Sequence, residues 1–163
     1  MKVLINTLGI SDSGGISVLE KLIQELAESN SNDKFYFTIN NNPLLINLIK
    51  NYQNQNKFDF RIVANKNYLY RFFYENYLFR KIIKKNGIDL IYNFSGTTQF
   101  FLSPPQIIKI HNLLFYCQKL DKNYFAQSKY FLWFKQVFFK AFVYRLMLKK
   151  SSHLEIQSNH VRE

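Results

Sequence analysis

The sequence has one cysteine, Cys117, and three histidines among its 163 residues. A single cysteine excludes an intramolecular disulfide, and together with the scattered His111, His153 and His160 it does not form the ligand set of a structural zinc site. We therefore expect no bound metal, with Cys117 as a small core residue and His153 and His160 without a functional role. A reducing, cytoplasmic compartment fits this cysteine usage best.

Acidic residues are scarce relative to basic ones. The chain has 11 Asp and Glu against 22 Lys and Arg, which gives a formal net charge of +11. A field of this sign attracts polyanions or an anionic membrane leaflet, although it does not determine a fold. The sequence lacks helix-turn-helix and RNP signatures, which disfavours nucleic acid as a partner. A possible anionic membrane surface remains as the second kind of partner.

Long hydrophobic runs without charge are also missing. The most apolar segment, 130–148, is interrupted by Lys135, Gln136, Lys140 and Arg145, so it does not predict a membrane-spanning helix. The N-terminus has no basic lead or small-residue cleavage site, so we expect no signal peptide. Because 47% of the residues are apolar, the chain is long and hydrophobic enough for one globular domain. We expect a cytoplasmic protein, either free or peripheral at the inner face of the cell membrane.

What the sequence does contain is a regular alternation of strand and helix patterns. Short β-branched and aromatic runs predict strands at 1–6, 34–39, 58–63, 88–93, 106–110 and 152–157. Apolar residues at helical spacing predict helices at 16–27, 43–52, 68–85 and 129–149. Asn67 is placed to cap the third helix, and Gly87 to end it. The alternation predicts a single α/β domain with a doubly wound, Rossmann-like and mostly parallel sheet.

The opening stretch carries the strongest local signal for a ligand. The first strand leads into a loop that ends in Gly14-Gly15, and a helix is predicted from Ile16, with Ser17 and Glu20 as a capping box. Helix N-termini present unpaired N–H groups, and glycines let an anion approach the backbone. The join therefore predicts a phosphate site, although a tight turn without ligand is an equal alternative. It is neither GxGxxG nor a P-loop, which disfavours a reductase.

Four features lie in a characteristic order along the chain: the Gly14-Gly15 loop, Ile88-Asp89-Leu90-Ile91-Tyr92, Ile110-His111-Asn112, and the segment 152–158. In this order and at these separations they resemble the N-terminal half of GT-B fold, family 4 type glycosyltransferases. The resemblance covers nearly all of 1–163. It implies the acceptor-side domain of a retaining glycosyltransferase that moves a sugar from a nucleotide-sugar donor to a glycan or lipid-linked acceptor, with no further cofactor.

The same resemblance implies that a second domain completes the enzyme. In this family an E-x7-E segment in a Gly-rich context belongs to the C-terminal, donor-binding domain. Glu155 and Glu163 have this spacing, but they lack the glycines and Glu155 lies in a predicted strand, so we interpret the match as accidental. Because the last residues have the pattern of a further helix start, we expect 1–163 to be one half of a larger protein and inactive alone.

The resemblance also assigns roles to individual residues. Gly14 and Gly15 would face the donor diphosphate, and His111 would be the catalytic residue, orienting the acceptor hydroxyl or shuttling its proton. Asn112 stands where the family often has Asp, which removes a charge. The acceptor cleft would be lined by Ser95, Gly96, Thr97 and Asn112. Without the resemblance, a lone histidine after an apolar strand, such as His111, is more often a structural residue, and the 95–98 loop equally well only turns the chain.

Two predicted helices, 68–85 and 130–150, combine many aromatic rings with Lys and Arg. This chemistry suits a lipid headgroup interface, but a doubly wound fold also needs apolar helix faces for its core. Both interpretations remain open. If the rings form the apolar helix faces of the fold, we expect most of them in the core. The alternative function is accordingly a stand-alone basic α/β module that binds a membrane surface or nucleic acid.

Overall fold

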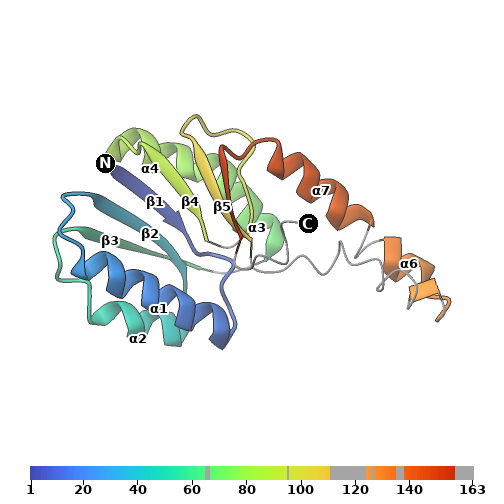
Figure 1. The fold of residues 1–163 in the computed structure, drawn as a ribbon, viewed down its shortest axis with the longest axis horizontal. Helices are drawn as coiled ribbons and strands as arrows, with labels where there is room; N and C mark the ends of the chain where they lie inside the picture. The colour runs from blue at the N-terminus through green and yellow to red at the C-terminus, as the bar shows by residue number, and fades with distance from the viewer. Residues whose placement is uncertain (65–66, 95, 111–123, 126, 135–137, 157–163) are drawn as a thin grey trace.

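A six-stranded, all-parallel sheet organises the protein (Figure 1). The computed structural model describes the chain except for 65–66, 95, 111–123, 126, 135–137 and 157–163. The strand order is β3-β2-β1-β4-β5-β6, which is the doubly wound order of Rossmann-like domains. The predicted α/β fold class is therefore confirmed.

The elements follow the predicted alternation closely. The strands are β1 (Lys2–Asn6), β2 (Lys34–Asn40), β3 (Phe58–Val63), β4 (Leu90–Asn93), β5 (Gln106–Ile110) and β6 (His153–Ile156). The helices are α1 (Ser13–Glu28), α2 (Pro43–Lys50), α3 (Tyr68–Phe73), the π-helical η1 (Tyr74–Leu78), α4 (Phe79–Asn86), α6 (Tyr130–Trp133) and α7 (Phe139–Leu148). Where one helix was predicted over 129–149, the structure describes α6 and α7 on either side of 135–137.

The topology has its switch point beside β1. This strand pairs with β2 on one side, Val3 opposite Phe35, and with β4 on the other, Val3 opposite Leu90. After β3 the chain crosses back through α3, η1 and α4 to form β4. In doubly wound sheets, ligands bind at the carboxyl ends of the strands that flank this reversal. The ends of β1 and β4 are therefore the first place to look for a site.

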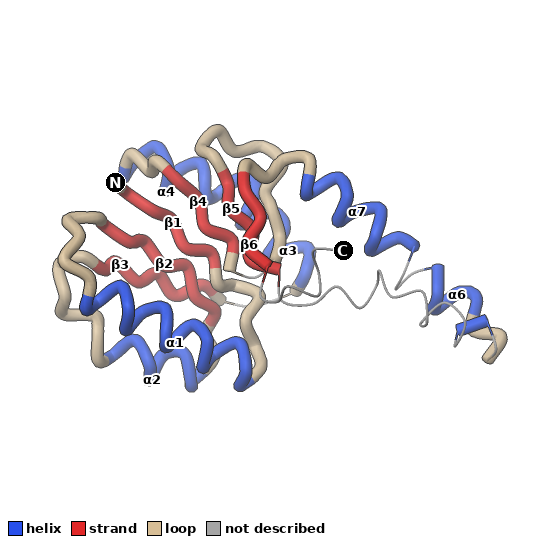
Figure 2. Tube along the Cα trace, viewed as in Figure 1, coloured by secondary structure: helices blue, strands red, loops and turns tan. Residues whose placement is uncertain are grey.

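Helices cover the two faces of the sheet unequally (Figures 1 and 2). On one face, here called the α1 face, α1 and α2 pack on strand residues such as Val3, Ile5, Phe37 and Phe58. On the opposite face, the α4 face, a second cluster joins Leu4, Tyr36, Tyr74, Phe79 and Ile82. Alternate residues of β1 and β2 enter one cluster or the other, as the two-residue period of a strand requires.

Helix α1 begins earlier than predicted. Ser13 is its first residue, so Gly14 and Gly15 lie in its first turn and not in a loop. Asp12 is the N-cap, and its carboxylate accepts a 2.6 Å hydrogen bond from the Gly15 amide. The predicted Ser17 capping box is wrong, because the Ser17 hydroxyl instead donates to the Ser13 carbonyl. An aspartate cap has offset the low helix propensity of the two glycines.

The predicted helix at 68–85 is helical throughout but changes type. Asn67 caps it as expected, accepting from the Tyr70 amide at 2.7 Å, and Gly87 ends it in the left-handed region at φ 64°. Between α3 and α4, residues Tyr74–Leu78 form a π-helix. Glu75 and Asn76 are buried in this turn. Single π turns are rare in helices and often mark functional positions.

Candidate functional site

Two asparagines lie at the carboxyl ends of the strands beside the switch point. Asn6 ends β1 and Asn93 ends β4, and both have no exposed surface. They are register partners in the sheet, and the Asn6 amide nitrogen donates to the Asn93 oxygen at 3.3 Å. Buried amides need such partners, because an unpaired one costs about 1–3 kcal/mol. The switch point of the sheet, between the ends of β1 and β4, is therefore polar.

A buried ion pair completes this polar centre. Glu75, only 5% exposed, accepts at the same oxygen from Asn6 at 3.0 Å and from Arg71 at 2.8 Å. The guanidinium of Arg71 also donates to the Thr97 hydroxyl at 3.0 Å. We call Asn6, Arg71, Glu75, Asn93 and Thr97 the edge cluster. Arg71 and Thr97 are half-buried, so they form its outer part, while the other three lie behind them.

The loop between β1 and α1 is fixed against the same edge. Asn40, at the end of β2, donates to the carbonyls of Leu8 at 3.3 Å and Ile10 at 2.6 Å. Thr7 bonds the Thr38 carbonyl through both its amide and its hydroxyl. The Leu8 amide donates to the Asn6 oxygen at 3.3 Å. Hydrogen bonds therefore hold this loop to the end of two strands, and the edge is preorganised before any ligand arrives.

Gly14 and Gly15 lie where the α1 N-terminus meets solvent, with Gly14 exposed and Gly15 half-buried. The Asp12 carboxylate already occupies the Gly15 amide, so a phosphate at that amide has to displace a like charge. A Cβ on Gly15 would lie 3.0 Å from the Ile10 side chain, whereas on Gly14 its nearest contact is 3.4 Å. Gly15 therefore has a packing reason that is independent of any ligand.

The predicted acceptor-cleft residues are only partly described. Gly96 is buried with φ 72°, a conformation that favours glycine, and it directly precedes Thr97 of the edge cluster. The structure therefore brings Thr97 to the switch point, while its role in an acceptor cleft stays a prediction. Ser95, Asn112 and the predicted catalytic His111 lie outside the described residues. His111 follows Ile110, the last residue of β5.

Part of the edge cluster was not predicted from the sequence. Arg71 and Glu75 fall within the predicted aromatic and basic helix 68–85, and their spacing of four residues is that of a helical ion pair. Asn6 and Asn93 each end a predicted strand. Two strand-terminal asparagines are the one signal that points to this edge.

A buried amide nearby has no partner. The Gln99 side chain is fully buried, and neither its oxygen nor its nitrogen has a hydrogen-bond partner among the described residues. Its backbone is held by Gln106, which donates to the Gln99 carbonyl at 2.7 Å and accepts from its amide at 3.1 Å. Gln106 also accepts from Asn93 at 3.1 Å. The connection from β4 to β5 is therefore tied directly to the edge cluster.

Glu155 has a structural role at a different place. It lies in β6, where its carboxylate accepts a short hydrogen bond from the Tyr92 hydroxyl and pairs with Lys109 at 2.8 Å. Burial and this carboxylate raise the pKa of Tyr92 well above its usual value, so the phenol stays a neutral donor. The three side chains tie β4, β5 and β6 together. This agrees with the interpretation that the Glu155 spacing to Glu163 is accidental.

Aromatic residues are more exposed than a core role allows. In the helix from 68 to 86, Tyr74 and Phe79 are buried, but Phe72, Phe73 and Tyr77 are 40–58% exposed. Around α6 and α7, the exposed rings are Tyr130, Phe131, Phe134, Phe138 and Phe142. The expectation that most rings are core is therefore wrong for these segments, because α6 projects away from the sheet and leaves its rings uncovered (Figure 1).

Comparison with protein family models, with curated proteins and with solved structures yields no match to this chain. Within the described residues, no three His, Cys, Asp or Glu side chains gather as a metal site. None of the described helices combines the length and the apolar character that crossing a bilayer needs. The geometry of the switch point is therefore the basis for assigning a function to this chain.

Proposed function

We propose that this chain is the acceptor-side domain of a retaining glycosyltransferase, whose donor-binding domain is a separate, second unit. The observation that supports this most is the edge cluster at the switch point of a doubly wound parallel sheet. Its outer groups, the guanidinium of Arg71 and the hydroxyl of Thr97, lie directly in front of buried amides and a carboxylate. Donors and acceptors side by side suit the hydroxyl groups of a sugar.

The edge cluster divides into contacting and positioning residues. Thr97 and Arg71, as the half-buried members, contact the acceptor in this proposal. Glu75 acts through Arg71, because its carboxylate holds the guanidinium at 2.8 Å. Asn6 in turn fixes the same carboxylate oxygen. Side chains locked by such second hydrogen bonds orient a substrate without having to be ordered during binding.

His111 and the α1 N-terminus complete the proposed mechanism. His111 would orient the acceptor hydroxyl or take part in moving its proton as the sugar is transferred. Gly14 and Gly15 would face the donor diphosphate. Because Asp12 occupies the Gly15 amide, we expect the diphosphate to approach the Ser13 and Gly14 amides, which have no acceptor within the helix.

A transfer assay with the complete gene product tests this function. The assay follows label from a panel of nucleotide sugars into glycan and lipid-linked acceptors. We expect His111→Ala to lower kcat by about 100-fold or more, the usual size of acid–base effects. His153→Ala is the matched control, because His153 is an exposed residue at the start of β6, and it should leave the rate unchanged. A complete product that binds no nucleotide sugar would overturn the proposal.

The exposed rings favour a second candidate function, association with an anionic membrane surface. Phe131 is 77% exposed and Tyr130 59%, and exposed Lys129, Lys149 and Arg145 accompany these helices. Rings and cations together insert at the headgroup level of anionic bilayers. In flotation with phosphatidylglycerol vesicles, Phe131→Ala should weaken binding. Leu44→Ala, which removes an apolar side chain on α2 that is 59% exposed, should not. Equal effects of both variants would exclude this candidate.

A further inference from the structure

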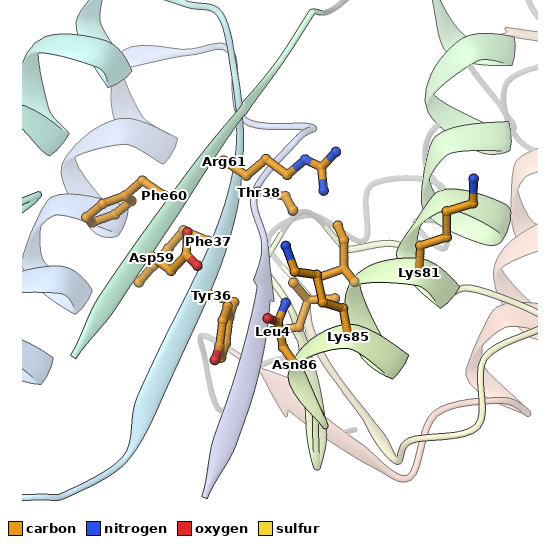
Figure 3. A pocket seen from close by; sticks show the side chains of 11 residues that line it. Leu4, Tyr36, Phe37, Thr38, Asp59, Phe60, Arg61, Lys81, Lys85 and Asn86 are labelled. Carbon is orange, nitrogen blue, oxygen red and sulfur yellow. The ribbon is translucent and has the colours of Figure 1, made fainter. Parts of the chain in front are cut away.

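A cationic groove lies on the α4 face, beside β2 and β3 (Figure 3). Its volume is about 310 Å³, at the small end of the range of about 300–1,000 Å³ for small-molecule sites. The groove exists because α3, η1 and α4 pack near β1, so the α4 face of β2 and β3 stays partly uncovered. Its lining includes Tyr36, Thr38, Asp59, Arg61, Lys81 and Lys85.

Positive charge enters the groove from two facing elements. Arg61 extends from β3 toward α4, and Lys85 extends from α4 back toward β2 (Figure 3). Lys81 lies one helical turn before Lys85 on the same helix. Asp59 is the single carboxylate among the described residues of the lining. Three cations against one anion leave a net positive cavity, which favours a ligand that carries more than one negative charge.

Two of these cations, Arg61 and Lys85, have no role in holding together the part of the fold that the structure describes. Neither Arg61 nor Lys85 has a hydrogen bond or an ion pair with any residue that the structure describes. By contrast, Lys2 and Lys57 both bond backbone carbonyls, and Arg71 and Lys109 pair with carboxylates. Arg61 and Lys85 therefore keep their donors available for a ligand. An Arg fork opposite a Lys suits phosphate oxygens in particular.

A buried phenol lies behind the groove. Tyr74 belongs to the same buried cluster as Leu4, Tyr36 and Ile82 of the lining, but it does not itself line the groove. Its hydroxyl is buried and has no hydrogen-bond partner among the described residues. Burial raises the pKa of Tyr74, and the nearby positive charge of Arg61 opposes this rise. The phenol stays neutral, so it does not offset the positive charge that Arg61 brings to the groove.

We propose that this groove binds a small phosphate ester, with Arg61 and Lys85 holding the phosphate from opposite walls and the Tyr36 ring packing on the organic part. The site is independent of the proposed sugar transfer, since it lies in the middle of the strands and not at their carboxyl edge. The phosphate belongs either to a free metabolite or to a lipid headgroup, and the experiment has one arm for each source.

Calorimetric titration of the chain with inorganic pyrophosphate and glycerol 3-phosphate forms the first arm. We expect saturable binding that weakens about tenfold or more in Arg61→Gln and in Lys85→Gln. Lys84→Gln is the matched control, because it removes the same charge from the neighbouring, exposed position of α4 and should change affinity less than twofold. Asp59→Asn should raise affinity, a gain that misfolding cannot produce.

Flotation with phosphatidic acid vesicles forms the second arm. Binding that Arg61→Gln weakens and Lys84→Gln does not, without binding of the soluble esters, would assign the phosphate to a lipid headgroup. Absence of saturable binding in both arms overturns the site. An equal loss in Lys84→Gln and Arg61→Gln also overturns it, because it would show a diffuse charge effect and no groove.

Discussion

Over strands β1 to β3, the two faces of the sheet differ in almost every respect. The α1 face carries Val3, Ile5, Phe35, Phe37, Phe58 and Phe60, whose rings pack on one another. The α4 face of the same strands carries Asn6, Tyr36, Thr38, Asn40, Asp59 and Arg61. Over these strands the first face is apolar, whereas the second combines the apolar Leu4 and Val63 with polar and charged side chains. Both the edge cluster and the groove belong to the polar face.

The difference follows from how completely helices cover each face. Two helices, α1 and α2, follow β1 and β2 and pack directly over these strands. On the opposite face, the crossover formed by α3, η1 and α4 covers the middle of the sheet and leaves part of β3 exposed to solvent. Charge is therefore tolerated at the exposed Asp59 and Arg61, whereas the polar side chains of Asn6, Thr38 and Asn40 on the same face are buried and need their hydrogen bonds. The contrast can be tested by substitutions on the two faces.

The largest expected effect is on the covered face. Phe37→Ala removes a fully buried ring that stacks on Phe60, with ring centroids 5.0 Å apart, and meets Phe58 edge-on, with ring centroids 5.8 Å apart. It should lower the free energy of unfolding by about 3–5 kcal/mol, measured by urea denaturation. Arg61→Ala, on the opposite face of the neighbouring strand, should change it by less than about 0.5 kcal/mol. Similar losses in both variants would contradict the contrast between the faces.

The next effect concerns the ion pair of the edge cluster. Glu75→Ala leaves the guanidinium of Arg71 and the amide of Asn6 without their shared acceptor, so we expect a loss of about 3 kcal/mol. Glu75→Gln should lose less, because its amide oxygen still accepts from both. The same denaturation curves measure this. If Glu75→Gln were as damaging as Glu75→Ala, the hydrogen bonds would not be what Glu75 contributes.

A smaller effect separates two adjacent glycines on the covered face. Gly14→Ala meets only an ordinary contact and gains helix propensity, so it should raise the free energy of unfolding by up to about 1 kcal/mol. Gly15→Ala has the same propensity gain but places its Cβ 3.0 Å from buried Ile10. We expect it to be less stable than Gly14→Ala by about 1–2 kcal/mol. Thermal unfolding of the two variants measures this difference. Equal stabilities would show that the Ile10 side chain can move aside without cost.

The smallest effect is a gain on the polar face. Gln99→Met replaces the unpaired, fully buried amide with an apolar side chain of similar shape. It should raise the free energy of unfolding by about 1 kcal/mol, because the desolvation cost of the amide disappears. Gln106→Met is the matched comparison and should destabilise, since the Gln106 amide makes three hydrogen bonds. A destabilised Gln99→Met variant would mean that the amide has a partner in the folded protein.

Much of the fold was predictable because its signals are local. The alternation Phe58, Asp59, Phe60, Arg61 reports one apolar and one polar face of β3, and that division is observed. The caps at Asn67 and Gly87 depend on neighbours three to five residues away. Such patterns are set by backbone geometry and are visible in sequence.

The edge cluster was less predictable because its partners are distant along the chain. Asn6 and Glu75 are 69 residues apart, and Asn6 and Asn93 are 87 apart. No local pattern distinguishes these asparagines from ordinary strand ends. The start of α1 was missed for a local reason, since two glycines argue against a helix and the Asp12 cap outweighs them.

The π-helical turn at Tyr74–Leu78 has a consequence for how this chain should be aligned. A π turn holds more residues than an α turn, so the helical phase of α4 is shifted relative to that of α3. A relative that lacks one residue between 74 and 78 can still form a continuous α-helix there. A sequence alignment that treats 68–86 as one uninterrupted α-helix will misplace Glu75. An alignment that allows a one-residue gap in the π turn keeps α3 and α4 in register.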